Sequence, residues 1–247
     1  MARLPILTFH ALDDAATPVA FRAAEFAALV DRFAKEGRST GRTADASSVA
    51  RGTAVAPRTV LFTFDDGYAS VADACSVLAA RGFRAVLYLS PALLDRPVIF
   101  PGESLCPAQR ALTWSEARAL ASAGHEIGSH AFDHVDLRRL SDAALVDQLE
   151  RSRGVLEDRL GVGVTSLAYP FGLNDPRTVR AATAVYETAV TTTLAYCGRG
   201  DDPLRLPRLD AHYLRGLAFR GDLEGAGTRA YLALRRTARG VRSWIRT

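Results

Sequence analysis

The chain has 247 residues, of which 48% are hydrophobic and 23% charged, so its composition excludes a disordered or fibrous protein and suits one globular domain over residues 1–247. The formal net charge of +4 comes almost entirely from arginine, because Lys35 is the only lysine, and a balance this mild predicts no nucleic-acid partner. Three widely separated cysteines without a Cys-x-x-Cys pair predict neither a disulfide framework nor a cysteine zinc site.

A strand-like apolar run begins at Leu4, close to the N-terminus. The N-terminus lacks the long apolar core and the small-residue cleavage site of a secretory signal. No apolar run approaches the roughly 18 residues that a membrane helix needs. We therefore expect a soluble protein that stays in the cytoplasm.

Strand and helix patterns alternate along most of the chain. Short apolar, often β-branched runs predict strands over 4–9, 60–64, 83–89, 125–130, 166–169, 188–193 and 204–213. Helical spacing predicts helices over about 21–36, 70–81, 113–124 and 142–160, and from Asp175 onward. This alternation predicts right-handed βαβ units and a parallel sheet, either open or closed.

Three segments do not fit the alternation. Residues 38–58 are rich in Ser, Thr, Ala, Gly and Arg with little periodicity, which predicts a surface insert. Residues 91–112 form a long connection with several prolines, which we interpret as a lid over a site. Residues 229–247 contain six arginines and no acid, with Leu234, Ala238, Val241 and Ile245 at helical spacing. They predict a basic final helix that either packs on the sheet or makes peripheral contact with anionic lipid.

Two adjacent carboxylates, Asp65 and Asp66, follow the apolar run 60–64 and precede Gly67. The run places them at the C-terminal end of a strand, where parallel α/β folds have their catalytic and ligand-binding residues. An aspartate there can also be only the N-cap of the next helix. The pair by itself therefore leaves catalytic, metal-binding and capping roles open.

Two histidines, His130 and His134, lie four residues apart at the end of another predicted strand. A helical turn after the strand would bring both imidazoles to one metal, although either can be an ordinary hydrogen-bonding residue. Parallel strands would add Asp66, and two imidazoles with one carboxylate leave an open position, as in a catalytic zinc site. Water bound there can ionise at about pH 7, and Asp65 would be free to take its proton.

A third motif, Ala168-Tyr169-Pro170-Phe171-Gly172, ends a further predicted strand. Pro170 has no N–H. The backbone amide of Phe171 can point toward the same C-terminal strand ends, where it would donate to an oxyanion. The alternative is an ordinary turn.

Together the three motifs resemble those of the NodB-like polysaccharide deacetylases, carbohydrate esterase family 4. The likeness spans about residues 5–212 and rests on Thr63-Phe64-Asp65-Asp66-Gly67, on Ser129-His130 with His134, and on Tyr169-Pro170-Phe171-Gly172. The resemblance implies a distorted (β/α)7 barrel and metal-dependent removal of acetyl groups from N-acetylated sugars or glycans. The form of the third motif is similar to that of the poly-N-acetylglucosamine deacetylase branch.

The resemblance also implies roles for single residues. Asp65 matches the catalytic base that deprotonates the attacking water. Asp66, His130 and His134 match the ligands of a divalent metal, for which we expect zinc first. Tyr169, Pro170 and Phe171 match the segment that contacts substrate, with the Phe171 amide as oxyanion donor.

Two features depart from the family pattern. The third motif begins with Ala168 where the family usually has an arginine that orients the catalytic aspartate, and Arg208 on the last predicted strand is the candidate replacement. The late Leu-x-His motif, which bears the general acid, is one residue longer here, in Leu209-Asp210-Ala211-His212. Strand alternation would put Arg208 and His212 on one face. His212 is therefore the first candidate acid and His10 the second, with surface, capping or packing roles as alternatives.

Three functions remain open at this point. The first is a metal-dependent N-deacetylase of sugars or polysaccharides. The second keeps the site but acts as a deformylase or amidohydrolase on a small or lipid-linked amide. The third is a weakly catalytic carbohydrate-binding module, which Ala168 and the inexact last motif would suit.

Overall fold

Seven parallel strands close into a barrel in the computed structural model, which describes residues 3–15, 17–103, 105–215 and 222–244, the last seven of them by their backbone alone. Around the ring the order is β2 (Ile6–Phe9), β12 (Leu206–Asp210), β10 (Thr188–Leu194), β9 (Ser166–Ala168), β8 (Glu126–Ser129), β7 (Ala85–Leu89) and β6 (Thr59–Phe64). Strand β6 pairs with β2 and closes the ring. The predicted (β/α)7 barrel is confirmed.

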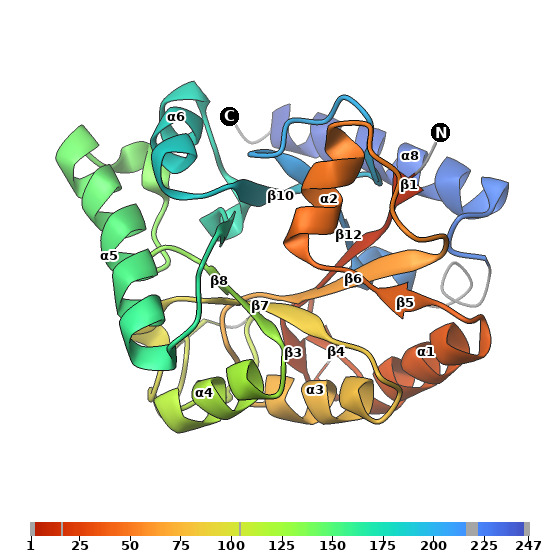
Figure 1. Cartoon of the computed structure of the whole chain (residues 1–247), viewed down its shortest axis with the longest axis horizontal. Coiled ribbons are helices and arrows are strands. Elements are labelled where there is room, and N and C mark those ends of the chain that lie inside the picture. Colours follow the sequence, from red (N-terminus) through yellow and green to blue (C-terminus); the bar gives the residue numbers. More distant parts are fainter. Residues whose placement is uncertain (1–2, 16, 104, 216–221, 245–247) are drawn as a thin grey trace.

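Helices cover the outside of this ring (Figure 1). They are α1 (Ala23–Lys35), α3 (Val71–Ala79), α4 (Trp114–Ser122), α5 (Asp142–Leu160), α6 (Pro176–Val185) and α8 (Ala226–Trp244). Their ends follow local sequence signals. The Thr113 hydroxyl accepts a hydrogen bond from the Glu116 amide at the start of α4, and Gly161 ends α5 with a φ of 70°, a conformation that glycine adopts without strain.

Short elements join the main ones. Strand β3 (Ala11–Leu12) pairs with β4 (Ala20–Phe21), and β1 (Arg3–Leu4) pairs antiparallel with β11 (Cys197–Gly198). Four 3-10 turns are η1 (Pro91–Leu93), η2 (Leu137–Arg139), η3 (Pro170–Gly172) and η4 (Ala211–Leu214). The described stretch between β10 and β12 contains β11 and no helix, so the βα alternation is interrupted once.

The segment 38–58 is not a surface insert. It forms β5 (Ser39–Thr40), which extends the sheet beside β6, and α2 (Thr43–Ala50), which lies over the N-terminal opening of the barrel in Figure 1. The α2 residues Ala46, Val49 and Ala50 are buried in one cluster with inward-facing strand residues. Because alanine and serine supply most of this buried face, the segment lacks the large apolar residues by which a helical period is recognised.

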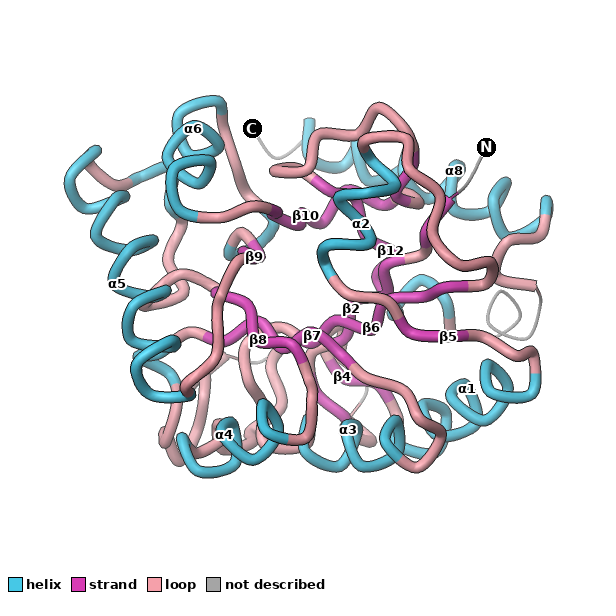
Figure 2. Tube along the Cα trace, viewed as in Figure 1, coloured by secondary structure: helices cyan, strands magenta, loops and turns pink. Residues whose placement is uncertain are grey.

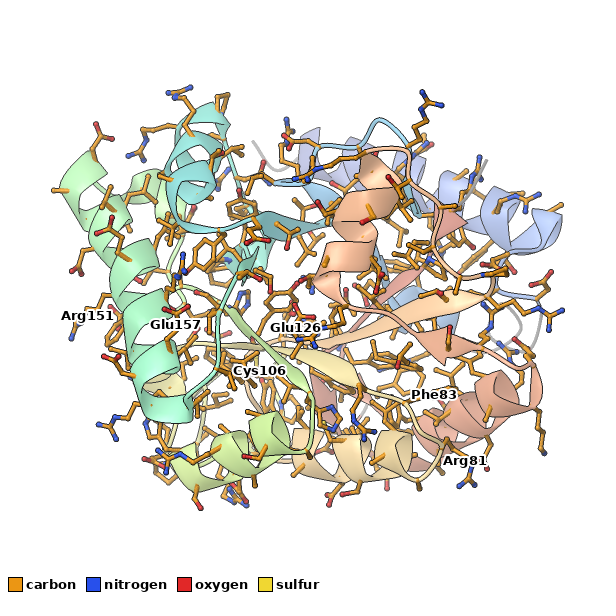
Figure 3. All side chains as sticks on the ribbon, viewed as in Figure 1. Arg81, Phe83, Cys106, Glu126, Arg151 and Glu157 are labelled. Atoms are coloured by element: carbon orange, nitrogen blue, oxygen red, sulfur yellow. The ribbon has the colours of Figure 1, made fainter. Side chains whose placement is uncertain are left out.

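A polar contact fixes α2 to the barrel rim. The Thr43 amide donates to Glu126 Oε2 at 3.1 Å, and the Thr43 hydroxyl donates to the other oxygen of the same carboxylate. Glu126 is the first residue of β8 and is labelled in Figure 3. The amino end of the barrel is thereby closed, which leaves the carboxyl ends of the strands as the open face.

Alternation along the strands divides the core into two parts. In β6, Phe62 and Phe64 point outward into the layer between strands and helices, whereas Leu61 points into the barrel. The ring looks empty in the trace of Figure 2, but the side chains drawn in Figure 3 fill it. The same alternation places Thr63 and Asp65 on the inward side at the open end.

Helix α8 packs against β10, with Leu232 buried and Leu234 70% exposed. Leu234 therefore does not lie on the buried face that the sequence predicted. The side chains of Ala238 and Val241, and residue Ile245, lie outside the described part of the chain, so contact of this helix with lipid stays a prediction. Among the described residues, no helical segment combines the length and the hydropathy that a membrane span requires.

Candidate active site

Arg208 and Asp65 form a two-point ion pair inside the barrel. Arg208 Nη1 lies 2.8 Å from Asp65 Oδ1 and Nη2 lies 2.7 Å from Oδ2, and each residue is 2% exposed. The guanidinium also donates to the Thr63 hydroxyl at 3.1 Å and, through Nε, to the Thr191 carbonyl at 3.0 Å. Arg208 thus lies beside the aspartate for which the sequence predicted it as the replacement arginine.

This pairing fixes the charge of Asp65. Burial raises the pKa of the Asp65 carboxyl, but Arg208, with smaller contributions from His130 and His10, holds that pKa below its ordinary value. Asp65 is therefore ionised at neutral pH and has one orientation. Each of its oxygens keeps a lone pair that Arg208 does not use.

Asp66, His130 and His134 converge next to this pair. Asp66 Oδ1 lies 3.4 Å from His130 Nε2 and 3.3 Å from His134 Nε2. Ligand atoms at about 2.1 Å from one tetrahedral ion are about 3.4 Å apart, so these separations fit a shared metal. His130 Nδ1 donates to the Ala168 carbonyl at 2.7 Å, which leaves Nε2 as the free nitrogen that a metal ligand needs.

Electrostatics favour the same arrangement. Burial raises the pKa of Asp66, but the imidazoles of His130 and His134 beside it outweigh burial and hold that pKa well below the ordinary value. A buried carboxylate that stays ionised between two imidazoles is a natural cation site. The three residues could hold a divalent metal.

The backbone at the site is strained. Six non-glycine residues in the described part of the chain have a positive φ: Arg58, Asp66, Asp95, Ala131, His134 and Phe171. Asp66, His134 and Phe171 belong to the site, and Ala131 lies between the two histidines. Such conformations cost of order 1 kcal/mol each and cluster where function requires them.

The predicted helical turn between the two histidines is wrong. Residues 130–134 form a loop in which Ala131 and His134 are left-handed, with φ of 59° and 56°. This loop brings the two imidazole rings to a centroid distance of 4.7 Å. The four-residue spacing correctly predicted that they meet, but through a different backbone path.

A cavity of about 470 Å³ opens over these residues and contains Asp65, Asp66, His130, His134 and His10 in its lining. One wall comes from the connection between β7 and α4, through Arg96, Ile99, Phe100, Glu103, Leu105 and Cys106. Two of the exposed large hydrophobic side chains of the protein line its rim, Leu105 at 60% and Phe171 at 57% exposure.

That connection is a fixed wall, not a loosely attached lid. The Leu112 amide donates to the Gly67 carbonyl at 2.8 Å and the Ala69 amide to the Arg110 carbonyl at 3.0 Å. Both bonds join it to the turn that follows Asp65 and Asp66. The sequence correctly predicted that this segment covers the site, but it did not identify which of its side chains face the cavity.

His10 and His212 differ in their placement. His10 lies in the cavity, close enough to lower the pKa of both Asp65 and Asp66. His212 lies on η4, because β12 ends at Asp210, whose carboxylate accepts the His212 amide at 2.9 Å and caps the turn. The predicted strand alternation therefore fails at His212, which is not among the residues lining the cavity.

The third motif contributes through Phe171. Tyr169 is buried and its hydroxyl donates to the Leu204 carbonyl at 3.1 Å, so Tyr169 supports the fold and does not line the cavity; the same is true of buried Pro170. The Phe171 ring lies 4.6 Å from the His134 ring. A Cβ on Gly172 would lie 2.1 Å from the Thr192 hydroxyl, so only glycine fits beside this cavity residue.

Comparison with known proteins points to one family. Residues 52–189 match the family model described as polysaccharide deacetylase. The chain is 26% identical to the protein YxkH of Bacillus subtilis over 211 residues, 84% of this chain and 71% of that protein. It is 28% identical to a chitin deacetylase of Pestalotiopsis over 130 residues, 51% of this chain but 39% of the relative.

Solved structures share the fold. The deacetylase PplD of Streptococcus pyogenes, in complex with acetate, superposes with a TM-score of 0.73 at 20% identity, over 85% of this chain and 92% of that chain. IcaB of Ammonifex degensii gives a TM-score of 0.73 at 22% identity, over 84% and 91%. Because the family match covers more than half of the sequence, this chain belongs to the polysaccharide deacetylase family.

Proposed function

We propose that this protein is a metal-dependent hydrolase that removes acetyl groups from N-acetylated sugars or glycans. One observation supports this more than any other. A carboxylate held ionised by a buried arginine lies next to a separate carboxylate–imidazole–imidazole group in one open cavity. The two adjacent aspartates thus have different partners and can perform different tasks.

Asp66, His130 and His134 would hold the metal. A divalent ion bound there, for which zinc is the first expectation, would polarise the amide carbonyl. It would also make water acidic enough to attack at neutral pH. Three protein ligands leave a position open, as catalytic sites require. Cobalt, nickel, manganese and iron accept the same set of donors.

Residues of the chain would transfer the protons and stabilise the negative charge that develops on the carbonyl oxygen. Asp65 accepts the proton of the attacking water, and Arg208 keeps Asp65 ionised and oriented. The Phe171 amide donates to the carbonyl oxygen as negative charge develops on it. His10 gives a proton to the leaving amine, because it faces the cavity and His212 does not line it.

Acetate release from N-acetylglucosamine oligomers tests this function. Metal-stripped protein is expected to be inactive and to regain activity with one equivalent of zinc, and metal analysis should give one ion per chain. Metal-free protein that binds glycan oligomers without releasing acetate would instead support a binding module and overturn the enzyme.

A second substrate class has an observation in its favour. Phe100 and Leu105 give the wall that also carries Arg96 and Glu103 an apolar part, with Leu105 mostly exposed, and an exposed apolar rim marks a binding surface for an apolar group. A small or lipid-linked amide would suit it. Hydrolysis of a formylated or lipid-linked amino sugar that Leu105→Ser slows severalfold, without acetate release from oligomers, would favour this class.

A further inference from the structure

A second cavity lies outside the barrel, away from the candidate active site. Its volume is about 370 Å³, and it lies between α8 and the connection from β10 to β11. Four arginines line it: Arg3, Arg199, Arg229 and Arg236. A neighbouring hollow of about 530 Å³ shares Arg3, Tyr196 and Arg229 with it and adds Glu224, so the two form one continuous groove in which arginines outnumber acids.

The positive charge in this groove is not neutralised by ion pairs. Within the described part of the chain, none of the four guanidinium groups pairs with a carboxylate, and the ion pairs of the protein use other arginines. Two acids, Asp201 and Glu224, line the groove together with the four arginines, and Arg229 Nη1 donates to the backbone carbonyl of Glu224. Asp201 Oδ2 accepts the Gly198 amide at 2.7 Å, and Glu224 lies 3.6 Å from Arg38. The sequence contains no acid after Glu224.

Ordered elements present two of these arginines. Arg3 is on β1 and pairs with Gly198 of β11, and the Gly200 amide donates to the Ala50 carbonyl at 2.9 Å, which ties the following turn to α2. The Arg199 side chain lies along the backbone of Gly52, where a Cβ would be 3.2 Å from Nε.

Helix α8 presents the other two arginines. Arg229 and Arg236 are seven residues apart and therefore lie on one face of the helix. Leu232, between them in sequence, is buried and also lines the cavity. The groove is thus built by three separate elements, which distinguishes it from a solvated basic face of one helix.

We propose that this groove binds a phosphate-bearing ligand. The arginine fork matches phosphate oxygens with two parallel hydrogen bonds, and arginine is the usual residue where planar recognition of phosphate matters. The Tyr196 ring and Leu194 line the same cavity and offer an apolar surface to the group that bears the phosphate. The ligand can be a soluble phosphate ester or the headgroup of an anionic lipid.

Calorimetric titration of the full-length protein tests the site, with inorganic phosphate and glycerol 3-phosphate as soluble probes at low ionic strength. Arg199→Glu and Arg236→Glu are each expected to weaken binding about tenfold, because each removes charge-assisted hydrogen bonds and adds a repulsive charge. The matched control is Arg180→Glu, at an exposed residue of α6 outside the groove. It changes the net charge equally and should leave binding unchanged.

Vesicles distinguish the two sources of phosphate. Co-sedimentation with phosphatidylcholine vesicles, with and without one third phosphatidylglycerol, is measured for the same variants. Loss of binding in Arg199→Glu and Arg236→Glu but not Arg180→Glu supports the site, and the probe that binds identifies the source. Equal loss in all three variants, or no binding of any probe to the unmodified protein, would overturn the proposal. Unchanged acetate release and melting temperature show that the variants fold.

Discussion

Arg208 and Asp65, 143 residues apart in sequence, meet in the barrel interior through two hydrogen bonds of 2.7 and 2.8 Å. The arginine comes from β12 and the aspartate from the end of β6, which are not adjacent strands in the ring because β2 lies between them. The pair therefore links β6 and β12 at the end of the barrel where the site lies. It supplies both charge balance and orientation to Asp65.

Removal of Arg208 should damage stability and activity together. Arg208→Met leaves a buried carboxylate without its partner, and we expect a loss of about 3–5 kcal/mol in the free energy of unfolding, measured in urea. Acetate release should fall by at least about a hundredfold, because an unpaired Asp65 becomes protonated. The double variant Asp65→Asn with Arg208→Met should recover most of the stability and none of the activity. A single variant that unfolds like the unmodified protein would contradict the buried pair.

The two adjacent aspartates should separate metal binding from proton transfer. Asp65→Asn is expected to keep a full equivalent of metal and to lose about 10²–10⁴-fold in kcat, because an amide cannot take a proton from water. Asp66→Asn should lose metal and activity together, because an amide is a much weaker ligand than a carboxylate. The variants carry the same chemical change one residue apart, so each is the control for the other. An active Asp65→Asn protein would remove its assignment as base.

The two candidate acids can be compared in the same way. His10→Ala should lower kcat about 10²-fold or more, because His10 faces the cavity, whereas His212→Ala should stay within a few-fold of the unmodified protein. Steady-state kinetics with one oligomer and constant metal loading measure both. If His212→Ala had the larger effect, the acid would have to reach the substrate from η4.

Much of the site could be predicted from sequence because its residues follow strand patterns. Alternation and strand ends predict the positions of Asp65, Asp66 and His130, and the family resemblance predicts Arg208 as the replacement for the arginine absent at Ala168. The predicted alternation fails at His212 because a capping aspartate ends β12 at residue 210, three residues before the end of the predicted strand. Local turn chemistry overrides alternation there.

Other features could not be read from the sequence. The helix α2 was missed because its buried face consists mainly of small residues, which give no hydrophobic period. The left-handed conformation of Ala131 depends on tertiary contacts, since alanine does not favour it, and histidine, which adopts it more often, does so too rarely for His134 to be predicted there. The cavity wall that includes Phe100 and Leu105 comes from a connection without periodicity. Hydrogen bonds fix the end of this connection to the turn after Asp66, and such long-range contacts leave no pattern in the sequence.

A residue outside the site should make stability depend on pH. His125 is 5% exposed, and its Nδ1 accepts the Ala85 amide at 3.1 Å, which requires the neutral ring. Burial, with a smaller contribution from Arg84, lowers the pKa of His125 to about 4. In the unfolded chain the pKa of histidine is about 6.5. Between these values the unfolded chain binds one more proton, so folding stability falls as the pH decreases through this window.

Urea unfolding at pH 7.5, 5.5 and 4.5 measures this effect. We expect His125 to contribute a loss of about 1–3 kcal/mol between the first and last pH, at about 1.4 kcal/mol per pH unit at most. His125→Asn can still accept the Ala85 amide but does not titrate, so its stability should decrease less over the same range. The other titrating groups are common to both proteins and cancel in the difference. Parallel curves for the two proteins would show that His125 is protonated in the folded state as readily as in the unfolded chain.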